Sequence, residues 1–363
     1  MADRGDLASA FVVGTGVVGG ALLDMLFAAD GAAGAEPPPP IRVAGVVNRR
    51  SVAIAREPGE ALSRAAVDAV RRAPPGAALP PIDDALLDRL AAHPSPVLVD
   101  VTAEAGMEAL YVRAFQRGIH VVTANKKPLV CPWPERQRLF AAASSGGARF
   151  GYEATVGAGM SVIETVRRLV RDGDAVRRVD CVLSGTLAFL SRELGAGTPL
   201  SRAVAIARER GFTEPDPRED LRGTDVARKL TIVARELGAP LEVADVALTP
   251  FVPQEALAAG AEGLAAALAR HDEGASARVA DLASRGEQLV YLARIDVEGG
   301  VVRASAGPAG VPSDHPAVAV PGSSAMAAFT TARHDREPLV LRRAGSGGRV
   351  TAAAIVRDVL RPG

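Results

Sequence analysis

A glycine-rich turn near the amino terminus constrains the fold more than any other part of this sequence. An apolar run, Ser9 to Val13, leads into a Gly-x-Gly-x-x-Gly turn, and an alanine- and leucine-rich stretch follows to about Ala29. A strand, this turn and a helix in that order are typical of a dinucleotide-binding βαβ unit. The glycines permit a tight turn, close approach of the backbone to a pyrophosphate, and close helix–strand packing. The expected cofactor contacts are Gly14, Thr15, Gly16, Val17, Val18 and Gly19.

The second predicted strand ends in basic residues. Ile41 to Val47 is apolar and leads into Asn48, Arg49 and Arg50. Dinucleotide-binding folds that use NAD commonly carry an acidic residue here, which holds the ribose 2′-hydroxyl, whereas arginine suits a 2′-phosphate. We therefore expect these three residues to contact the cofactor, with NADP(H) favoured over NAD(H). The alternative is a solvated basic turn.

Two later strands place polar residues at the same edge of the predicted sheet. Val97 to Val101 is followed by Thr102, and Ile119 to Thr123 is followed by Lys126 and Lys127. Ligands of open parallel sheets bind beyond the carboxyl ends of the strands, so Thr102 and Lys126 are expected at the cleft. A lysine there can hydrogen-bond a ribose or a substrate oxygen. The alternative is a loop lysine in water, which is our interpretation of Lys127.

The alternation of strands and helices stops near residue 150, which indicates a second domain. Arg149 to Ala154 is expected to be a strand, and a helix follows with an apolar stripe of Ile163, Val166, Leu169 and Val170. Later strands are separated by several helices, a pattern that favours a mixed sheet. A last helix, Val350 to Leu360, is expected to return to the first domain.

These features predict an α/β chain of two domains. The first is a Rossmann-type dinucleotide-binding domain of residues 1–150, completed by about 340–363. The second is an α+β domain of residues 151–339 with a mixed sheet, for substrate binding, catalysis and dimerisation. A length of 363 residues suits two domains better than one.

An acidic segment, residues 211–230, is the least ordinary part of the chain. Its five carboxylates fall within twelve residues and belong to Glu214, Asp216, Glu219, Asp220 and Asp225. Pro215 and Pro217 predict a stiff loop. A helix capped by Thr224 is expected to follow, with Asp225 and Lys229 on one face because they are four residues apart.

The rarity of lysine singles out Lys229. Of 42 basic residues only Lys126, Lys127 and Lys229 are lysines, and all the others are arginine. A compositional bias explains why lysines are few. Arginine stays protonated near neutral pH, whereas lysine can act as an acid or base, so a proton-transfer role is favoured for Lys229. The alternative is an ordinary Asp–Lys pair on a helix.

Composition excludes several classes of function. The formal net charge is zero with no basic block, so nucleic acid or an anionic membrane is not an expected partner. The sequence shows no signal peptide and no apolar run of transmembrane length. Cys131 and Cys181 have no metal or redox spacing, which suits a reducing, cytoplasmic location. The five histidines form no ligand cluster.

Taken together, the motifs resemble those of homoserine dehydrogenase over nearly the whole chain. The matching segments, in chain order, are Gly14–Gly19, Asn125–Pro128, Tyr152–Gly159, Ser184–Thr186, Gly211–Leu230 and Gly345–Thr351. The resemblance implies an NAD(P)-dependent oxidoreductase acting on a CH–OH group. The implied reaction interconverts L-homoserine and L-aspartate 4-semialdehyde, in the biosynthesis of threonine and methionine.

The resemblance also implies roles for individual residues. Lys229 is expected to be the main acid/base at the substrate oxygen, with Lys126 assisting and also contacting the cofactor. Glu214 and Asp225 are expected to hold the substrate ammonium group, with Asp220 nearby. The further cofactor contacts implied are Thr102 and Gly345.

A cation site and a dimer are further implications of the resemblance. Glu153 and the backbone carbonyls of Val156, Ala158 and Met160 are expected to hold a sodium or potassium ion, the alternative being a plain strand-to-helix turn. The family is usually a homodimer through its central domain. Because the sequence ends at Gly363, we expect a form without a C-terminal regulatory ACT domain.

Two alternatives of different kinds stay open from the residues. One is another two-domain NAD(P)-dependent amino-acid dehydrogenase. Aspartate semialdehyde dehydrogenase is disfavoured because it needs a nucleophilic cysteine, whereas Cys131 precedes a proline and Cys181 lies within a predicted strand. The other is a catalytically silent NADP-binding sensor. Such a protein would have no need of all four of Lys126, Glu214, Asp225 and Lys229.

Overall fold

The computed structural model describes residues 7–28, 38–74, 79–321, 324–344 and 347–361. The chain divides into two compact units. Unit 1 consists of Met1–Gly159 and Gly347–Gly363, and unit 2 of Met160–Ser346. No helix in the described parts of the chain is both long enough and apolar enough to cross a membrane.

Unit 1 is built on a six-stranded, mainly parallel sheet. The strand order is β3-β2-β1-β4-β5-β6, and every neighbouring pair is parallel except β2 and β3. The strands are β1 (Ala8–Val13), β2 (Ile41–Val47), β3 (Val52–Ile54), β4 (Pro96–Asp100), β5 (His120–Thr123) and β6 (Phe150–Gly151). This order is the doubly wound α/β arrangement expected for a dinucleotide-binding domain, and it confirms the predicted fold class of the first half.

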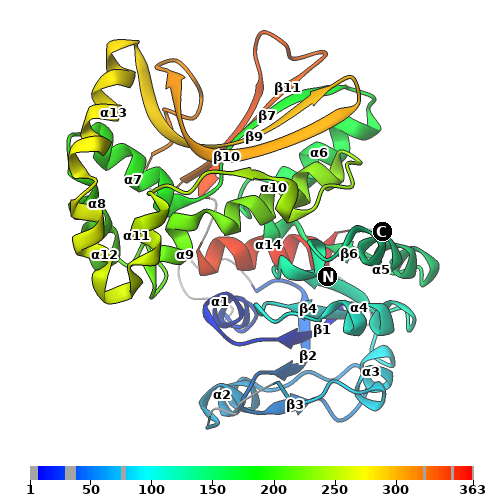
Figure 1. Ribbon diagram of the computed structural model, residues 1–363. Coiled ribbons are helices and arrows are strands. Elements are labelled where there is room, and N and C mark those ends of the chain that lie inside the picture. Colours follow the sequence, from blue (N-terminus) through cyan, green and yellow to red (C-terminus); the bar gives the residue numbers. More distant parts are fainter. Residues whose placement is uncertain (1–6, 29–37, 75–78, 322–323, 345–346, 362–363) are drawn as a thin grey trace. The chain divides into compact units, whose positions relative to one another are not determined.

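Helices cover both faces of this sheet because side chains of β1 alternate between two apolar cores. Val12 packs in one core with helices α1 (Val17–Leu26), α2 (Arg64–Arg72) and α14 (Gly348–Leu360). Phe11 and Val13 pack in the other, with α3 (Asp84–Ala91), α4 (Glu108–Phe115) and α5 (Trp133–Ser145). Figure 1 shows α14, from the end of the chain, in unit 1 near α1.

Unit 2 contains a second six-stranded sheet, which is mixed as predicted. Its order is β12-β11-β7-β9-β10-β8, with only β8 and β10 parallel. The strands are β7 (Val176–Val182), β8 (Ala247–Leu248), β9 (Glu287–Glu298), β10 (Val301–Pro312), β11 (Ser324–Thr331) and β12 (Leu339–Ala344).

Helices α6 and α10 run along one face of the second sheet (Figure 1). The other helices of unit 2 gather beside it. The helices of unit 2 are α6 (Val162–Arg171), α7 (Gly185–Gly195), α8 (Leu200–Glu209), α9 (Pro217–Arg222), α10 (Thr224–Glu236), α11 (Gln254–Ala258), α12 (Gly260–Ala269) and α13 (Asp272–Ser284).

Several predicted elements differ from the structure. The strand expected over Arg149–Ala154 is only Phe150–Gly151, because Glu153–Thr155 forms a buried 3-10 turn instead. Val170 is 50% exposed, because it lies at the edge of the apolar stripe in the last turn of α6. The acidic segment is not only a loop, since it contains the short helix α9.

The start of α10 also differs from its prediction. Thr224 is the first helical residue and not its cap. The capping position belongs to Gly223, which adopts the left-handed conformation at φ 74°. A Cβ atom at Gly223 would lie 2.1 Å from the hydroxyl oxygen of Tyr291, so glycine is required there for two reasons, backbone conformation and space.

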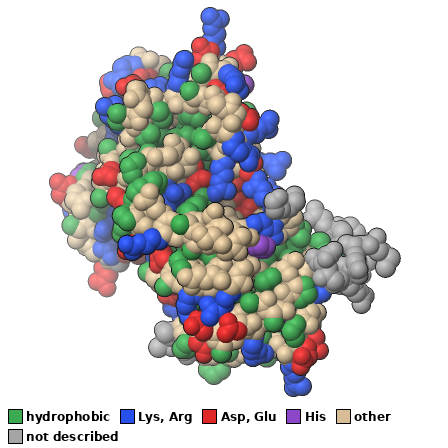
Figure 2. Space-filling model, turned by 90° about the vertical axis from the view of Figure 1, so that its right-hand side faces the viewer, with side chains coloured by type: hydrophobic (Ala, Val, Ile, Leu, Met, Phe, Trp, Pro, Cys, Tyr) green, Lys and Arg blue, Asp and Glu red, His purple; other side chains and the backbone are tan. Residues whose placement is uncertain are grey.

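Acidic and basic side chains are interspersed on the face of the molecule shown in Figure 2. This distribution agrees with the formal net charge of zero.

Candidate active site

The three glycines of the turn after β1 do different physical work. Gly14 has φ 104°, and a Cβ atom there would lie 3.1 Å from the methyl carbon of Thr102. A Cβ atom at Gly19 would lie 2.2 Å from the carbonyl oxygen of Gly14, so α1 could not pack on the turn. A Cβ atom at Gly16 would meet nothing within 4 Å. The open side of Gly16 is therefore suited to a bound pyrophosphate, as the fingerprint requires.

The first turn of α1 has no side-chain cap. Gly16 is the capping residue, and among the described residues of that turn none is acidic. Helix α14 begins close by, since a Cβ atom at Gly348 would lie 2.9 Å from the carbonyl oxygen of Val17. Its first turn also lacks a side-chain cap and an acidic residue. Such helix termini favour anions. Gly345, a predicted cofactor contact, lies outside the described residues.

Asn48, a predicted cofactor contact, hydrogen-bonds to the glycine-rich turn and to the turn after β2. Its amide nitrogen donates to the hydroxyl of Thr15 at 2.7 Å and to the carbonyl of Val70 at 3.2 Å. Its amide oxygen accepts from the backbone N–H groups of Arg50 and Ser51 at 2.7 and 3.0 Å. The side chain thus has at least four protein partners and is 7% exposed, so it positions Thr15 and the basic turn.

The two arginines after β2 are exposed and have protein partners of different kinds. The Nε of Arg49 donates to the carboxylate of Glu104 at 3.0 Å, and its Nη2 contacts the same oxygen. Arg50 donates from Nη1 to the carbonyl of Arg71 at 2.6 Å. Glu104 carried no predicted role. Its only sequence signal was its place shortly after β4, in the same loop as Thr102.

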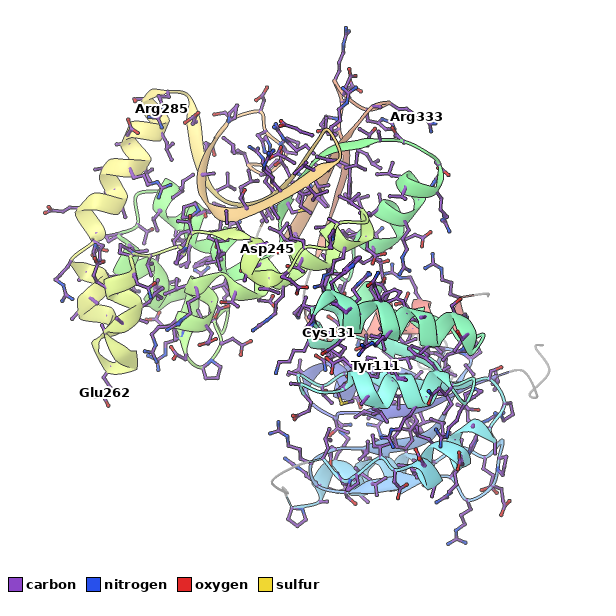
Figure 3. The ribbon with its side chains drawn as sticks, turned by 45° about the vertical axis from the view of Figure 1, so that its right-hand side comes forward. Tyr111, Cys131, Asp245, Glu262, Arg285 and Arg333 are labelled. Atoms are coloured by element: carbon purple, nitrogen blue, oxygen red, sulfur yellow. The ribbon has the colours of Figure 1, made fainter. Side chains whose placement is uncertain are left out.

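A buried polar network supports the ends of β4 and β5. The Asp100 carboxylate is fully buried and accepts from the backbone N–H of Thr102 at 2.8 Å, the hydroxyl of Tyr111 at 2.5 Å and the amide of Asn125 at 3.1 Å. Tyr111 comes from α4 (labelled in Figure 3). Burial and the neighbouring Asp100 raise the pKa of the Tyr111 hydroxyl, so Tyr111 remains a donor. The network fixes the loops that carry Thr102 and Lys126.

The two lysines after β5 are both half-buried. Lys126 directly precedes the 3-10 turn Lys127–Leu129. The interpretation of Lys127 as a loop lysine in water was incomplete, because its Nζ donates to the carbonyl of Ala103 at 2.6 Å. Lys127 therefore helps to hold the Thr102–Glu104 loop.

In unit 2, Lys229 is held between two oxygen atoms. Its Nζ lies 2.8 Å from the carboxylate of Asp225, one turn earlier on α10, and donates to the carbonyl of Leu183 at 2.7 Å. The Lys229 side chain is 12% exposed, whereas that of Asp225 is 50% exposed. The ammonium group is therefore fixed in position, with one neighbouring carboxylate accessible to solvent.

Asp220 connects the acidic segment to the start of α7. It accepts from the backbone N–H of Glu214 at 2.8 Å and from the hydroxyl of Thr186 at 3.2 Å. Thr186 also donates to the carbonyl of Phe212 at 2.6 Å. Burial raises the pKa of the Asp220 carboxyl. Thr186 and the Leu183 carbonyl had no predicted role, although the Ser-Gly-Thr motif marked their position.

The remaining carboxylates of the segment differ in use. Asp216 caps α9 and pairs with Arg218 at 2.6 Å, and hydrogen bonds from Arg218 lower the pKa of that carboxyl. Glu214 and Glu219 are exposed. Glu214, Glu219 and the half-exposed Asp225 are therefore the carboxylates of this segment that an incoming cation can reach.

The turn after β6 contains backbone carbonyls that were predicted to bind a cation. Gly157 has φ 53°, and the carbonyl of Ala158 accepts from Nη2 of Arg357 at 2.8 Å. The Asp358 carboxylate accepts from the backbone N–H of Glu153 at 2.9 Å. A carbonyl oxygen has two lone pairs, so the contact with Arg357 uses only one of the two on Ala158. In the parts of the chain that the structure describes, no cluster of three His, Cys, Asp or Glu side chains could hold a metal.

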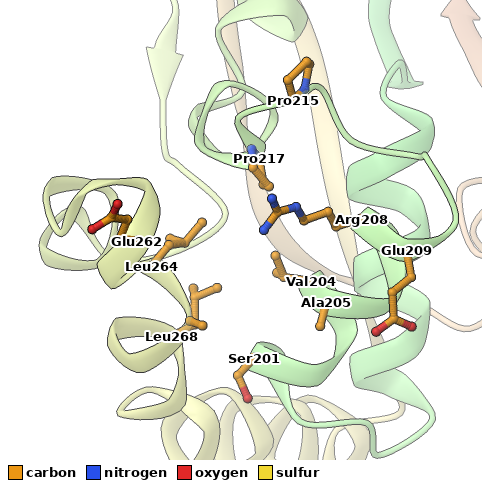
Figure 4. Close-up of a pocket in the computed structure, with 11 residues that line it drawn as sticks. Ser201, Val204, Ala205, Arg208, Glu209, Pro215, Pro217, Glu262, Leu264 and Leu268 are labelled. Carbon is orange, nitrogen blue, oxygen red and sulfur yellow. The ribbon is translucent and has the colours of Figure 1, made fainter.

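A cavity of about 680 Å³ lies between α8 and α12 (Figure 4). Pro215 and Pro217 of the acidic segment line it, together with Arg208 and apolar side chains of both helices. None of the predicted substrate residues lines it, so we assign the cavity no part in the chemistry.

Comparison with protein families gives two matches that together span most of the chain. A family model described as homoserine dehydrogenase matches residues 162–360. A second model, described as the NAD-binding domain of homoserine dehydrogenase, matches residues 14–153.

Individual relatives are similar over about three quarters of the chain. A bifunctional aspartokinase/homoserine dehydrogenase 2 from Zea mays chloroplasts is 38% identical over 271 residues, which are 74% of this chain but only 29% of that protein. The homoserine dehydrogenase of Emericella nidulans is 37% identical over 77% of this chain and 78% of its own length. A crystal structure of a putative homoserine dehydrogenase from Archaeoglobus fulgidus is similar over 97% of this chain and 98% of that one, with a TM-score of 0.73 and 25% identity.

Proposed function

We propose that this chain, which belongs to the homoserine dehydrogenase family, interconverts L-homoserine and L-aspartate 4-semialdehyde with NAD(P)(H). The observation that carries the proposal is the Lys229 ammonium group, held by Asp225 and the Leu183 carbonyl beside a segment of carboxylates. An amino-acid substrate needs carboxylates for its ammonium group, and a carbonyl that accepts hydride needs a proton donor.

Lys229 donates the proton to the substrate oxygen when the aldehyde is reduced, and it receives the proton when the alcohol is oxidised. The bound dinucleotide supplies or accepts the hydride. The two contacts of Lys229 hold its Nζ in one place, which is what a proton donor requires. Lys126 assists at the same oxygen and contacts the cofactor.

Glu214 and Asp225 bind the substrate ammonium group. Asp220 serves them indirectly, because it accepts the backbone N–H of Glu214 and ties the segment to Thr186. A substrate cation that reaches Asp225 meets a carboxylate already paired with Lys229. Binding therefore redistributes the hydrogen bonds of Lys229 toward the substrate oxygen.

The cofactor lies on the turn Gly14–Gly19, whose open side at Gly16 supports a close pyrophosphate. Thr102 and Lys126 contact its ribose or nicotinamide part, Arg49 and Arg50 bind a 2′-phosphate, and Gly345 belongs to the same site. NADP(H) is accordingly favoured over NAD(H). Asn48 acts through the position of Thr15.

A monovalent cation, sodium or potassium, binds Glu153 and the carbonyls of Val156, Ala158 and Met160. The support is the donor set, since hard oxygen ligands suit such ions. Arg357 already contacts the Ala158 carbonyl and shares it with the ion. Melting temperatures measured in potassium, sodium and tetramethylammonium chloride test this site, and equal values in all three salts would argue against it.

The protein works as a cytoplasmic homodimer formed through unit 2, in threonine and methionine biosynthesis, without nucleic acid or membrane partners. The buried thiols of Cys131 and Cys181 suit a reducing compartment. Light scattering coupled to size exclusion measures the assembly directly, and a mass of one chain at micromolar concentration would rule the dimer out.

The substrate assignment is tested with a panel of amino-acid alcohols. L-homoserine, L-serine and L-threonine are each offered with NADP, and reduction of the nicotinamide is followed by absorbance. We expect oxidation of L-homoserine alone, because its hydroxyl lies one carbon farther from the ammonium group than the hydroxyl of L-serine or L-threonine. Preference for L-serine or L-threonine would favour another amino-acid dehydrogenase.

A further inference from the structure

An ion pair crosses the end of the strand that carries the glycine-rich turn. Arg49 lies two residues after β2, and Glu104 lies four residues after β4. Strands β2 and β4 both pair with β1, one on each side. A contact between residues beyond the carboxyl ends of β2 and β4 must therefore pass over the end of β1. The turn Gly14–Gly19 begins at that point.

Glu104 is held in place by its own backbone. Its N–H donates to the hydroxyl of Thr102 at 3.1 Å, and its carbonyl accepts from the amide of Asn125 at 2.8 Å. Asn125 is itself 2% exposed and tied to Asp100. Next to it, the carbonyl of Ala103 accepts from Lys127. The Glu104 carboxylate, 33% exposed against 60% for Arg49, is the more fixed member of the pair.

The Glu104 carboxylate lies where dinucleotide-binding folds recognise the ribose of the cofactor. In folds of this class an acid after the second strand binds the ribose 2′-hydroxyl of NAD, and arginine nearby binds the 2′-phosphate of NADP. This chain has Arg49 after the second strand, but Glu104 reaches the same place from the loop after β4. A carboxylate accepts a hydrogen bond from a hydroxyl and repels a phosphate, whereas a guanidinium attracts the phosphate.

We propose that Glu104 sets the cofactor selectivity of this site. It competes with the 2′-phosphate of NADP(H) for Arg49, and it accepts a hydrogen bond from the 2′-hydroxyl of NAD(H). The inference rests on the proposed function to the extent that the glycine-rich turn binds a dinucleotide. Glu104 weakens the preference for NADP(H) that Arg49 and Arg50 create, so the enzyme uses both cofactors.

The test compares Glu104→Gln with the unaltered protein. Dissociation constants are measured for NADPH and NADH by nicotinamide fluorescence, and for 2′,5′-ADP and ADP by calorimetry. The substitution frees Arg49 from its partly exposed ion pair and removes a negative charge that repels the 2′-phosphate. We therefore expect NADPH and 2′,5′-ADP to bind about three- to tenfold more tightly. NADH and ADP are expected to bind no more tightly than before. Arg49→Gln is expected to have the opposite effect, which is weaker binding of NADPH relative to NADH.

Glu108→Gln is the matched control. Glu108 begins α4, four residues after Glu104, and its replacement removes the same charge from the same region. We expect Glu108→Gln to change the dissociation constants of NADPH and NADH by no more than about 1.5-fold, which corresponds to the weakest interactions measured for exposed ion pairs. Glu104→Ala repeats the test without the amide, in case glutamine still hydrogen-bonds to Arg49.

An unchanged NADPH/NADH ratio in both Glu104 variants would overturn the inference, as would weaker NADPH binding, which would mean that Glu104 orients Arg49 for the phosphate. In either case homoserine oxidation by the unaltered protein would leave the proposed function intact. Failure of the unaltered protein to bind any of the four nucleotides would instead overturn the proposed function and the inference with it.

Discussion

At the scale of single residues, the proposed proton transfer depends on Lys229. Lys229→Ala removes the proposed proton donor and its ion pair with Asp225, so we expect kcat to fall by about a hundredfold or more. Steady-state kinetics with L-homoserine measure the change. Arg168→Ala, which removes an exposed cation from α6, should leave kcat within about twofold. A near-normal kcat for Lys229→Ala would assign the proton transfer to another group.

Asp220 gives a prediction about pH at the same scale. Burial raises the pKa of its carboxyl in the folded protein, so the folded state binds a proton more tightly than the unfolded state there. The contribution of Asp220 to the free energy of unfolding is therefore largest below the pKa that the carboxyl has in the unfolded chain. It declines as pH rises through the higher pKa of the folded protein. Relative to Asp220→Asn, the unaltered protein should gain stability as pH falls through that window. Urea unfolding from pH 3 to 7 gives the difference, and a constant difference would refute the shift.

At the scale of elements, the junction between α9 and α10 depends on Gly223. An alanine there would meet the Tyr291 hydroxyl and also hold a positive φ, so we expect Gly223→Ala to cost about 2–5 kcal/mol of unfolding free energy. Tyr291→Phe removes the clashing oxygen, together with its 3.1 Å hydrogen bond to Thr249. The double variant should recover part of the loss in urea unfolding. No recovery would mean that the backbone conformation accounts for the whole cost.

The sequence predicted some elements well because their signals are local. Strand β2 has the predicted bounds, and β1 and α1 begin close to where the glycine-rich turn places them. Helix α9 was missed although its signals were present, namely Asp216 as the cap and Pro217 in the first turn. Strand β11 was missed because Ser324–Thr331 is rich in alanine and becomes a strand only through pairing with distant β7 and β12.

In the candidate site, too, residues in local motifs could be predicted and residues that depend on distant contacts could not. Lys229, Asp225 and the glycine-rich turn could be named as candidates because each belongs to a local motif of recognisable chemistry. The contact of Glu104 could not be predicted, and neither could that of Thr186 although a local motif marks its position, since their partners are 55 and 34 residues away in the chain. Contacts across such separations depend on the order of strands in the sheet, which no local pattern specifies.

At the scale of the whole molecule, the end of the chain completes unit 1. The side chain of Ile355 on α14 is fully buried in the core that also contains β1 and α1. Ile355→Ala should therefore cost about 2–5 kcal/mol and lower the melting temperature of unit 1 together with cofactor affinity. Leu360, on the same helix, is 41% exposed, and Leu360→Ala should change the melting temperature little. Differential scanning calorimetry compares them, and equal effects would contradict this assignment of α14.

The proposed reaction of the chain is hydride transfer between NADP(H) and the homoserine/aspartate semialdehyde pair. The most direct measurement is the initial rate with purified protein in both directions, L-homoserine with NADP or NAD and L-aspartate 4-semialdehyde with NADPH or NADH. We predict turnover in both directions. At limiting cofactor concentration it should be faster with NADP(H) than with NAD(H), and Lys229→Ala should abolish it. Absence of turnover with every cofactor across the pH range in which the protein stays folded would contradict the account.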